Sequence, residues 1–290
     1  MEKILLDTDI GSDIDDALCL AYLLANPACN LLGITTVTGE SAKRAMLADV
    51  LCKHAKKNIP IFPGTENSLI IPQKQPVAQQ AVKLADWPHE VNFPKGQAVD
   101  FLRETIHTNP GEITLLTIGP LTNIALLFKI DPEIPLLLKK IVMMSGVFKI
   151  QQPYCEWNVT CDPHAAAIVY GAPVKKSISI GLDVTLQCTM NIEEIKKRFN
   201  IPFLKPVFDL AKVWFENTDK ITFHDPLAAV TVFHNDVCSF EKGTVEIELM
   251  NEKIIGKTLF NKDSNNLKHK IAINVDVKNF FLYYFSVFNS

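Results

Sequence analysis

The stretch that decides the fold spans residues 5–17 and reads Leu5-Leu6-Asp7-Thr8-Asp9-Ile10-Gly11-Ser12-Asp13-Ile14-Asp15-Asp16-Ala17. Apolar residues lie on both sides of it, as expected for a buried strand that leads through a short loop into a helix. Five aspartates fall within ten residues, and with Glu2 they make up six of the 32 acidic residues of the chain. A strand, a polar loop and a helix in this order indicate the first unit of an α/β fold.

Strand-like and helix-like segments continue to alternate beyond this stretch. The predicted strands are Lys3–Asp7, Leu31–Val37, Pro60–Phe62, Ile113–Ile118, Ile141–Ser145, Lys176–Ile180 and Asp183–Leu186. The predicted helices are Asp15–Ala25, Ser41–Lys56, Ala98–Thr108, Leu121–Leu127 and Pro163–Tyr170. Such alternation is typical of a parallel sheet with helices on both faces. Residues 64–94 have no sustained period, so we expect a long loop that is either functional or poorly ordered.

After Asp236 the pattern changes to short strands followed by a terminal amphipathic segment. These are Thr244–Leu249, Lys257–Phe260 and Lys270–Val275, and then Val277–Phe288. No internal repeat and no linker-like change of composition divides the chain. We therefore predict an α/β fold in a single domain, residues 1–290. Its mostly parallel, Rossmann-like central sheet is covered by helices and carries a small antiparallel C-terminal appendage.

The composition excludes several classes of protein. Of the 290 residues 48% are hydrophobic, which suffices for a sizeable core and argues against disorder. The net charge of −3 and a pI of about 6.2 argue against a nucleic-acid binder with a basic surface. No apolar run reaches the roughly 18 residues of a membrane span. The seven cysteines form no C-x-x-C pair and follow no secretory signal, so we expect a reducing, cytoplasmic setting.

Polar or glycine-rich segments follow four of the predicted strands. They are residues 7–16, 38–40, 119–123 and 145–146. Ligands of open parallel sheets bind outside the carboxyl ends of the strands, so these segments predict a site. Helix capping, at about 0.3–1 kcal/mol per carboxylate, explains one or two of the five aspartates. A hard cation such as Ca²⁺, which takes about 6–8 oxygen ligands, would relieve the repulsion among all five.

Two other chemistries of aspartate-rich loops fit less well. An EF-hand needs glycine at loop position 6 and glutamate at position 12. Counting from Asp7, glycine falls at position 5 and Leu18 at position 12. The Asp7-x-Asp9 pair also resembles the phosphohydrolases of the haloacid dehalogenase type, in which Asp7 would be the nucleophile. That family typically has threonine or valine in place of Gly11, and no later glycine–aspartate pair is present to hold magnesium. An aspartate-dependent phosphohydrolase therefore stays the less favoured alternative.

Four segments together resemble the inosine–uridine-preferring nucleoside hydrolase family over nearly the whole chain. They are Asp7-Thr8-Asp9-Ile10-Gly11 with Asp15-Asp16-Ala17, Ile118-Gly119-Pro120-Leu121-Thr122-Asn123, Glu156-Trp157-Asn158 with Asp162-Pro163, and His224-Asp225-Pro226-Leu227-Ala228. The resemblance implies Ca²⁺-dependent hydrolysis of the N-glycosidic bond of ribonucleosides in nucleoside salvage. The transition state would resemble an oxocarbenium ion. The resemblance also implies a small-molecule nucleoside substrate and a homodimer or homotetramer.

The resemblance further implies a role for each matching residue. The metal ligands would be the carboxylates of Asp9, Asp16 and Asp225 and the backbone carbonyl of Ile118. Asp9 would also act as the general base on a water molecule, and His224 would lie beside the departing base. The substrate would contact Asp15, Glu40, Met144, Glu156, Asn158 and His224. We also expect Asp7 to support the metal ligands from behind, and Trp157 to be a buried aromatic residue.

Three features depart from the family pattern. Glu40 stands where many members carry asparagine, although its carboxylate could still accept a sugar hydroxyl. Ser145 replaces the first glycine of the usual Met-Gly-Gly, and the short loop before Glu156 leaves Gln151 or Gln152 to replace a sugar-binding asparagine. These departures motivate a second hypothesis, a non-catalytic, metal-dependent nucleoside- or ribose-binding protein. The base-contacting segments, 64–94 and 217–223, do not align with the family, which leaves the preferred base and the role of Asp13 open.

Overall fold

The protein is built on one large, mostly parallel sheet. The computed structural model describes residues 1–150, 155–262 and 268–288, and within them nine strands form this sheet in the order β10-β9-β11-β6-β5-β4-β1-β2-β3. The strands are β1 (Glu2–Thr8), β2 (Cys29–Thr36), β3 (Ile61–Pro63), β4 (Ile113–Thr117), β5 (Lys140–Met144), β6 (Ser177–Ile180), β9 (Cys238–Ile247), β10 (Thr258–Asn261) and β11 (His269–Val275). From β3 to β6 the order is that of the Rossmann fold, 3-2-1-4-5-6, as predicted.

Helices cover both faces of the sheet because the side chains of its strands alternate between them. On β1, Ile4 and Leu6 pack with one apolar cluster and Leu5 with the other. The first face carries α1 (Asp15–Ala25), α2 (Ser41–His54) and α11 (His224–Phe233). The second carries α3 (Ala98–Thr108), α4 (Thr122–Ile130), α5 (Ile134–Leu137) and α7 (Pro163–Gly171).

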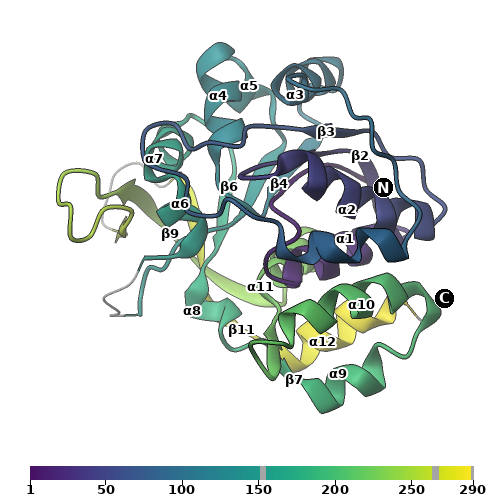
Figure 1. Cartoon of the computed structure of the whole chain (residues 1–290). Helices are drawn as coiled ribbons and strands as arrows, with labels where there is room; N and C mark the ends of the chain where they lie inside the picture. The colour runs from purple at the N-terminus through teal and green to yellow at the C-terminus, as the bar shows by residue number, and fades with distance from the viewer. Residues whose placement is uncertain (151–154, 263–267, 289–290) are drawn as a thin grey trace.

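A further layer lies outside α1 and α11 and forms the lower part of the molecule in Figure 1. It holds α9 (Ile192–Arg198), η2 (Pro202–Leu204), α10 (Lys205–Trp214), α12 (Val277–Ser286) and the two-stranded antiparallel sheet of β7 (Thr189–Asn191) and β8 (Lys220–Thr222). The Tyr284 hydroxyl donates to the carbonyl of Leu18 over 3.1 Å and its ring stacks on Tyr22, which anchors α12 on α1. None of the helices in the described ranges is both long and apolar enough to cross a membrane.

Most of the predicted elements are confirmed within one or two residues, but residues 64–94, expected to be one long loop, contain the 3₁₀ helix η1 (Gln79–Asp86). The C-terminal strands are antiparallel to one another, and β11 joins them to the central sheet by pairing parallel with β6. The predicted strand Asp183–Leu186 is wrong, since this segment is the short helix α8 (Leu182–Thr185). The Asp183 carboxylate accepts backbone N–H groups of residues 148–150, and these bonds fix it in a turn beyond the end of β6. The single-domain organisation over residues 1–290 remains a prediction.

The position of β1 in this order creates a crevice at the carboxyl ends of the strands. β1 pairs with β2 on one side and with β4 on the other, and the helices that follow β1 and β4 lie on opposite faces. The segments that follow β1 and β4 therefore run to opposite faces of the sheet, and a ligand can bind in the space between them. The aspartate-rich loop follows β1, and Ile118 and Gly119 follow β4, so both flank the crevice.

Candidate active site

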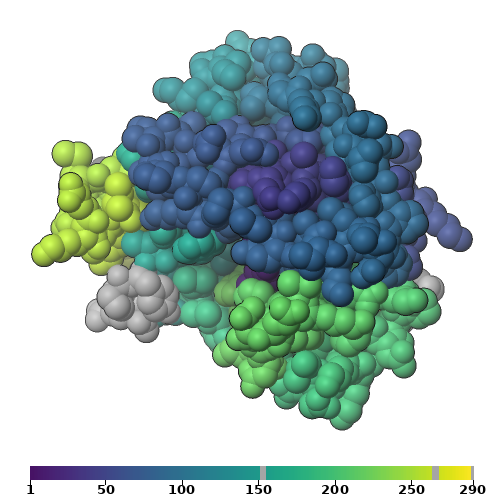
Figure 2. Space-filling view, viewed as in Figure 1, coloured from purple at the N-terminus to yellow at the C-terminus, as the bar shows by residue number. Residues whose placement is uncertain are grey.

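A pocket of about 570 Å³ lies in this crevice, a volume in the range of small-molecule sites. In Figure 2 purple N-terminal atoms are visible in the hollow between the blue segment around residues 64–94 and the green region of α9 and α10. Loops after β1, β4 and β5, the N-terminal ends of α6 (Trp157–Cys161) and α11, and the end of α10 form its wall. The lining residues that could carry chemistry are Asp9, Asp13, Asp15, Asp16, Lys74, Gln75, Ile118, Met144, Glu156, Trp157, Asn158, Trp214, Asn217, His224 and Asp225.

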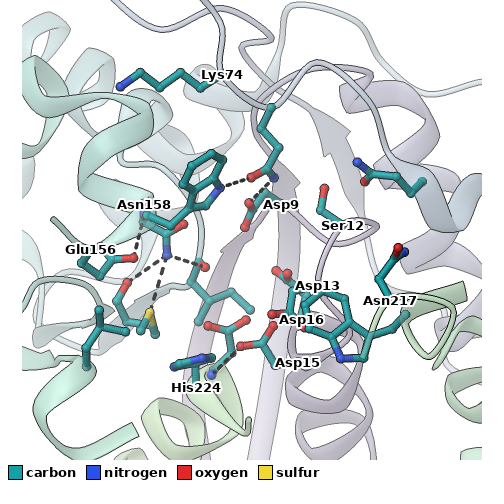
Figure 3. A pocket seen from close by; sticks show the side chains of 18 of the residues that line it. Asp9, Ser12, Asp13, Asp15, Asp16, Lys74, Glu156, Asn158, Asn217 and His224 are labelled. Atoms are coloured by element: carbon teal, nitrogen blue, oxygen red, sulfur yellow. Dashed lines mark hydrogen bonds between the residues drawn. The ribbon is translucent and has the colours of Figure 1, made fainter. Parts of the chain in front are cut away.

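Three buried carboxylates gather at one point of the pocket. Oxygens of Asp15, Asp16 and Asp225 lie within 4.8 Å of one another, and they are the group in the described residues that could hold a metal ion. Asp15 and Asp16 occupy the first turn of α1, and Asp225 occupies the first turn of α11. The positive ends of both helix dipoles therefore lie at the same cluster of acids, of which Figure 3 labels Asp15 and Asp16.

The electrostatics of this cluster favour a bound cation. Burial raises the pKa of Asp15, Asp16 and Asp225 well above the usual value, and the neighbouring carboxylates raise it further. Three crowded carboxylates offer the oxygen ligands that hard divalent cations prefer. Ile118 also lines the pocket, and its carbonyl oxygen accepts a hydrogen bond from the Asn158 amide over 3.0 Å. The donor set present therefore fits a cation such as Ca²⁺.

Asp9 lies beside this cluster, and each of its two carboxylate oxygens contacts a neighbouring residue. Its Oδ2 accepts a hydrogen bond of 2.6 Å from the Gln75 amide. Its Oδ1 faces the start of the β4–α4 turn, where a Cβ on Gly119 would lie only 2.7 Å away. Burial raises the pKa of Asp9, while the charge of Arg44 and the Gln75 amide oppose that rise. Only glycine at position 119 lets the two strand ends approach this closely.

A fully buried arginine supports the acidic loop from behind. The Arg44 guanidinium donates to the backbone carbonyls of Asp9, Ile10, Gly39 and Val77. These bonds tie the loop after β1 to the residue before Glu40 and to the 75–78 segment. The guanidinium also donates to the Ser12 hydroxyl over 3.1 Å, and its positive charge acts on both Asp9 and Asp16.

Opposite the acids, the first turn of α6 forms the wall next to β5. The Asn158 amide donates to the carbonyls of Ile118 and Met144 over 3.0 and 3.1 Å. The Glu156 carboxylate caps α6 by accepting the N–H groups of Asn158 and Val159, and it also accepts the N–H of Gly146. Burial raises the pKa of Glu156 to about 7. Met144, Glu156 and Asn158 therefore share one rigid wall of the pocket.

His224 closes the pocket at the N-terminus of α11. Its Nδ1 lies 2.8 Å from the Thr185 hydroxyl on α8, which fixes the ring. Burial lowers the pKa of His224 to about 4, so that the imidazole is neutral at pH 7. The aromatic ring of Trp214 and the amide of Asn217 extend the lining on this side. A neutral imidazole here can donate or accept a hydrogen bond within a partly apolar end of the pocket.

The sequence profile of one family, described as inosine-uridine preferring nucleoside hydrolase, matches residues 4–282. The chain belongs to this family. Among relatives, an uncharacterized protein of Schizosaccharomyces pombe is 32% identical over 283 residues, which cover 89% of this chain and 88% of the relative. Uridine nucleosidase 1 of Arabidopsis thaliana is 29% identical, with 85% and 78% of the two chains covered.

Solved structures agree with this nucleoside hydrolase fold. A plant nucleoside hydrolase superposes with a TM-score of 0.88 at 23% identity, covering 100% of this chain and 99% of the other. A purine-preferring ribonucleoside hydrolase from Gardnerella vaginalis gives 0.86 at 23% identity, with 99% and 98% covered. At such low identity these structures establish the fold alone.

This nucleoside hydrolase gathers most, but not all, of the predicted site residues in its pocket. Asp9, Asp15, Asp16, Ile118, Met144, Glu156, Asn158, His224 and Asp225 all line it. Asp15, predicted as a ribose contact, takes the place in the three-carboxylate group where Asp9 was predicted. Gln151 and Gln152 lie outside the described residues.

Glu40 is the predicted substrate contact that the structure does not bring into the pocket. Its carboxylate pairs with Lys43 over 2.5 Å and accepts the N–H of Ala78 over 2.9 Å. The residue has a left-handed backbone with φ 59°, and the turn before α2 directs the side chain toward these partners. Through its hydrogen bond to the Ala78 N–H, the Glu40 carboxylate holds residue 78 against the start of α2.

Asp7 stays compatible with a supporting role behind the pocket, whereas the expectation for Trp157 is wrong. The Asp7 carboxyl is completely buried, accepts hydrogen bonds from Thr35 and Asn123, and is not part of the pocket lining. The phosphohydrolase alternative loses its nucleophile for this reason. Trp157, expected to be buried, is 52% exposed at the pocket rim, because its indole N–H donates to Gln75 instead of packing in the core.

Sequence reasoning missed Gln75 and the end of α10. Gln75 falls in the aperiodic 64–94 segment, where nothing in the pattern distinguishes one glutamine from another. Trp214 lies one turn after the buried Leu210 and Ala211 of an amphipathic helix. Had α10 been recognised from that spacing, its C-terminal end next to residues 217–223 would have been a candidate for the pocket wall.

Proposed function

We propose that the protein hydrolyses the N-glycosidic bond of ribonucleosides to ribose and free base, with Ca²⁺ as cofactor, in nucleoside salvage. The observation that carries this proposal is a single pocket in which Asp15, Asp16 and Asp225 face Asp9 and His224. The family to which the chain belongs supports the reaction class. The chemistry of the pocket supports the remainder, as follows.

Asp16 and Asp225, with Asp15 or Asp9 and the Ile118 carbonyl, would hold the cation. A bound Ca²⁺ would supply positive charge that orients sugar hydroxyls and makes a water molecule more acidic. Asp9 would accept the proton of that water and direct its oxygen toward the anomeric carbon. The fixed position of the Asp9 carboxylate supports this role, since a general base must lie within hydrogen-bond reach of the proton it takes.

The remaining pocket residues would bind the sugar and stabilise the transition state. Positive charge that develops on the ribosyl ring is stabilised more than the neutral ground state by a wall rich in carboxylates. Asp15, Asn158 and Glu156 would contact ribose hydroxyls, with Met144 beside the ring. His224, neutral at pH 7, would donate a hydrogen bond to the departing base from the ring nitrogen opposite Thr185.

A base-release screen tests this function. Purified protein is supplied with purine, pyrimidine and nicotinamide ribosides, with Ca²⁺ or with chelator, and free bases are separated by chromatography. Uridine is included first because the Arabidopsis relative is named for it. We expect release in the presence of Ca²⁺, its loss in Asp9→Ala, and wild-type rates in the control Asp100→Ala, which removes an exposed aspartate of α3. Equal release by wild type and Asp9→Ala would refute the assignment.

A metal-dependent nucleoside-binding protein without catalysis is the second candidate. It is favoured by Glu156, whose carboxylate accepts three backbone N–H groups, and by Glu40, which points out of the pocket. Both observations reduce the number of carboxylate oxygens that are free to accept hydrogen bonds from the sugar hydroxyls. Calorimetry distinguishes the two candidates. A binding protein gives a heat of nucleoside binding with Ca²⁺, and no free base is present in the calorimeter cell after the titration, whereas an enzyme releases base.

We further propose a cytoplasmic homodimer or homotetramer. All seven cysteines are free thiols and six of them are buried, which supports a reducing compartment. Light scattering after size-exclusion chromatography measures the assembly, for which a molar mass of one chain, 32.4 kDa, would contradict the proposal.

A further inference from the structure

The side chain of Gln75 lines the pocket and bridges Trp157 and Asp9, the latter labelled in Figure 3. Its Nε2 lies 2.6 Å from Asp9 Oδ2, and its Oε1 lies 2.5 Å from the indole Nε1 of Trp157. Gln75 is only 7% exposed, although its neighbours on both sides are exposed. A buried glutamine between two exposed neighbours is thus held by polar partners from the loop after β1 and from α6.

The chemistry of the two partners fixes the orientation of the Gln75 amide. An indole nitrogen can only donate a hydrogen bond, so the group that faces Trp157 must be the amide oxygen. The amide nitrogen then faces Asp9 and donates to it. Reversing the amide would place N–H against N–H at Trp157 and oxygen against a carboxylate at Asp9. Trp157 therefore sets which atom Gln75 presents to Asp9.

The backbone around Gln75 is anchored to the acidic loop, so the contact is part of a rigid wall. The N–H of Gln75 donates to the Gln73 side chain over 2.7 Å. The Ala78 N–H bonds Glu40, and Arg44 bonds the Val77 carbonyl. The N–H of Gln80 donates to the carbonyl of Gly11 over 2.9 Å. The segment can thus hold the amide in place before any ligand enters.

We propose that Gln75 is a positioning residue for Asp9, oriented by Trp157. The Gln75 amide holds Oδ2 of Asp9 while the turn at Gly119 confines Oδ1, so the plane of the carboxylate is set before substrate binds. Asp9 is then ready to take a proton from water and to face the cation without losing rotational freedom in the reaction. This inference rests on the proposed function of Asp9 and assigns a role to a segment that the family motifs do not include.

The test compares Gln75→Leu and Gln75→Glu with a matched control, Gln97→Leu, which changes an exposed glutamine without a side-chain cap bond. Partners of this kind typically contribute 10–100-fold to activity or metal affinity. We expect Gln75→Leu to lower kcat about 10–100-fold, with KM within about twofold of wild type. Gln75→Glu should lose at least as much, because its carboxylate cannot donate to Asp9 and repels it.

A double-mutant cycle with Trp157→Phe, which keeps the ring and removes the indole N–H, isolates the relay. If Trp157 acts on kcat through Gln75, the double variant Gln75→Leu/Trp157→Phe has the kcat of Gln75→Leu alone. Multiplying effects would overturn the relay, because they mean that the two residues act independently. A rise of KM at unchanged kcat in Gln75→Leu would also overturn it, because Gln75 would then be a substrate contact.

Calorimetric titration of chelated protein with Ca²⁺ alone provides a readout that does not depend on turnover. We expect Gln75→Leu to bind Ca²⁺ roughly tenfold more weakly than wild type and Gln97→Leu. If wild type binds Ca²⁺ but releases no base, the proposed function fails, and this titration still decides the inference. Ca²⁺ affinity equal to wild type in Gln75→Leu, with kcat also unchanged, would overturn the positioning role while leaving the proposed function intact.

Discussion

The backbone N–H of Asp225 donates a hydrogen bond of 3.4 Å to the Asp15 carboxylate, although 210 residues separate the two along the chain. The bond joins the first turn of α11 to the first turn of α1. The N-terminal loop supplies most of the acids of the pocket, but the three-carboxylate group is complete only when the last third of the chain has folded onto it. Metal binding and global folding are therefore expected to be coupled.

Removing one charge from the three-carboxylate group should stabilise the metal-free protein. Asp16→Asn keeps an acceptor for the Thr8 hydroxyl, which bonds Asp16 over 2.5 Å, and removes the repulsion by Asp9 and its neighbours. We expect thermal denaturation in chelator to show a rise of a few degrees in Tm, corresponding to about 1 kcal/mol. Ca²⁺ should no longer stabilise this variant. A lower Tm in chelator than that of wild type and of the control Asp100→Asn would contradict the repulsion argument.

The metal-free protein should lose stability as the pH rises toward 7 and beyond. Burial raises the pKa of Glu156 from 4.5 to about 7 and that of Asp7 from 3.8 to about 7. Between these pH values the folded state binds protons that the unfolded state has released. The resulting contribution to the free energy of unfolding is fully present below about pH 4 and is lost as the pH rises through about 7. These shifts correspond to at most about 3 kcal/mol for Glu156 and about 4 kcal/mol for Asp7.

Denaturant unfolding at pH 6 and pH 8 measures this effect. In chelator the free energy of unfolding should be higher at pH 6, and Ca²⁺ should stabilise the protein more at pH 8, where the carboxylates are ionised. The buried His269 and His224, whose pKa values are lowered to about 4, oppose this trend only between about pH 4 and 6.5. A chelated protein that is more stable at pH 8 would refute the prediction.

The contribution of His224 to kcat should be larger for a poor leaving group than for a good one. Because burial keeps the ring neutral at pH 7, its contribution is a hydrogen bond to the leaving group. We expect His224→Ala to lower kcat for a natural nucleoside by about 10²–10³, the usual effect of losing one such donor. For a 4-nitrophenyl riboside, whose leaving group departs as a stable anion, the loss should stay below about tenfold. Equal losses on both substrates would show that His224 does not act on the leaving group.

Gly119 should be required for the position of Asp9. A Cβ at this residue would lie 2.7 Å from Asp9 Oδ1 and 2.9 Å from the Asp9 backbone nitrogen. Gly119→Ala must therefore displace the carboxylate, and a shift of about 1 Å can cost about 10²-fold in rate. Gly171→Ala is the control, since nothing lies within 4 Å of its new methyl group. Steady-state kinetics would count against this geometry if Gly119→Ala matched the control.

Arg44 should be required for stability, and more so when Ca²⁺ is absent. Arg44→Met removes the arginine's hydrogen bonds to four carbonyls of the acidic loop and its neighbours, together with a buried positive charge that acts on Asp9 and Asp16. Because Asp9 and Asp16 lose a buried positive charge that opposes their own, we expect a loss of about 3–5 kcal/mol in chelator and a smaller loss with Ca²⁺. Unfolding curves are compared with those of Arg103→Met, an exposed arginine on α3. An equal loss with and without Ca²⁺ would mean that Arg44 does not counterbalance the acids.

The sheet was predictable because its signals are local and repeated. Strands such as Ile113–Thr117 are continuous apolar runs, and α1 and α3 were predicted to the residue. Prediction failed where long-range bonds decide the conformation. Asp183 turns the chain at α8 through bonds to residues 148–150, a contact between segments that no local pattern encodes.

The acidic part of the site was predictable for a different reason. Aspartates close together in one loop repel one another, and a bound cation can offset this repulsion. The close spacing of Asp15, Asp16 and the aspartates before them is visible in the sequence itself. Gln75 carries no such cost, since an uncharged glutamine in a loop is normally solvated. Glu40 was misplaced because its partners, Lys43 and the N–H of Ala78, depend on a left-handed turn that the sequence does not reveal.

The central claim is that Ca²⁺ at the three-carboxylate group is required for base release, and a Ca²⁺ titration of base release tests it most directly. Chelated protein is mixed with a panel of ribonucleosides, and free base is measured as Ca²⁺ is added. The account predicts no release in chelator, release that saturates at one Ca²⁺ per chain, and none from Asp16→Asn at the same Ca²⁺ concentration. Release that is equal in chelator and in Ca²⁺, or absent from wild type at every Ca²⁺ concentration, would contradict it.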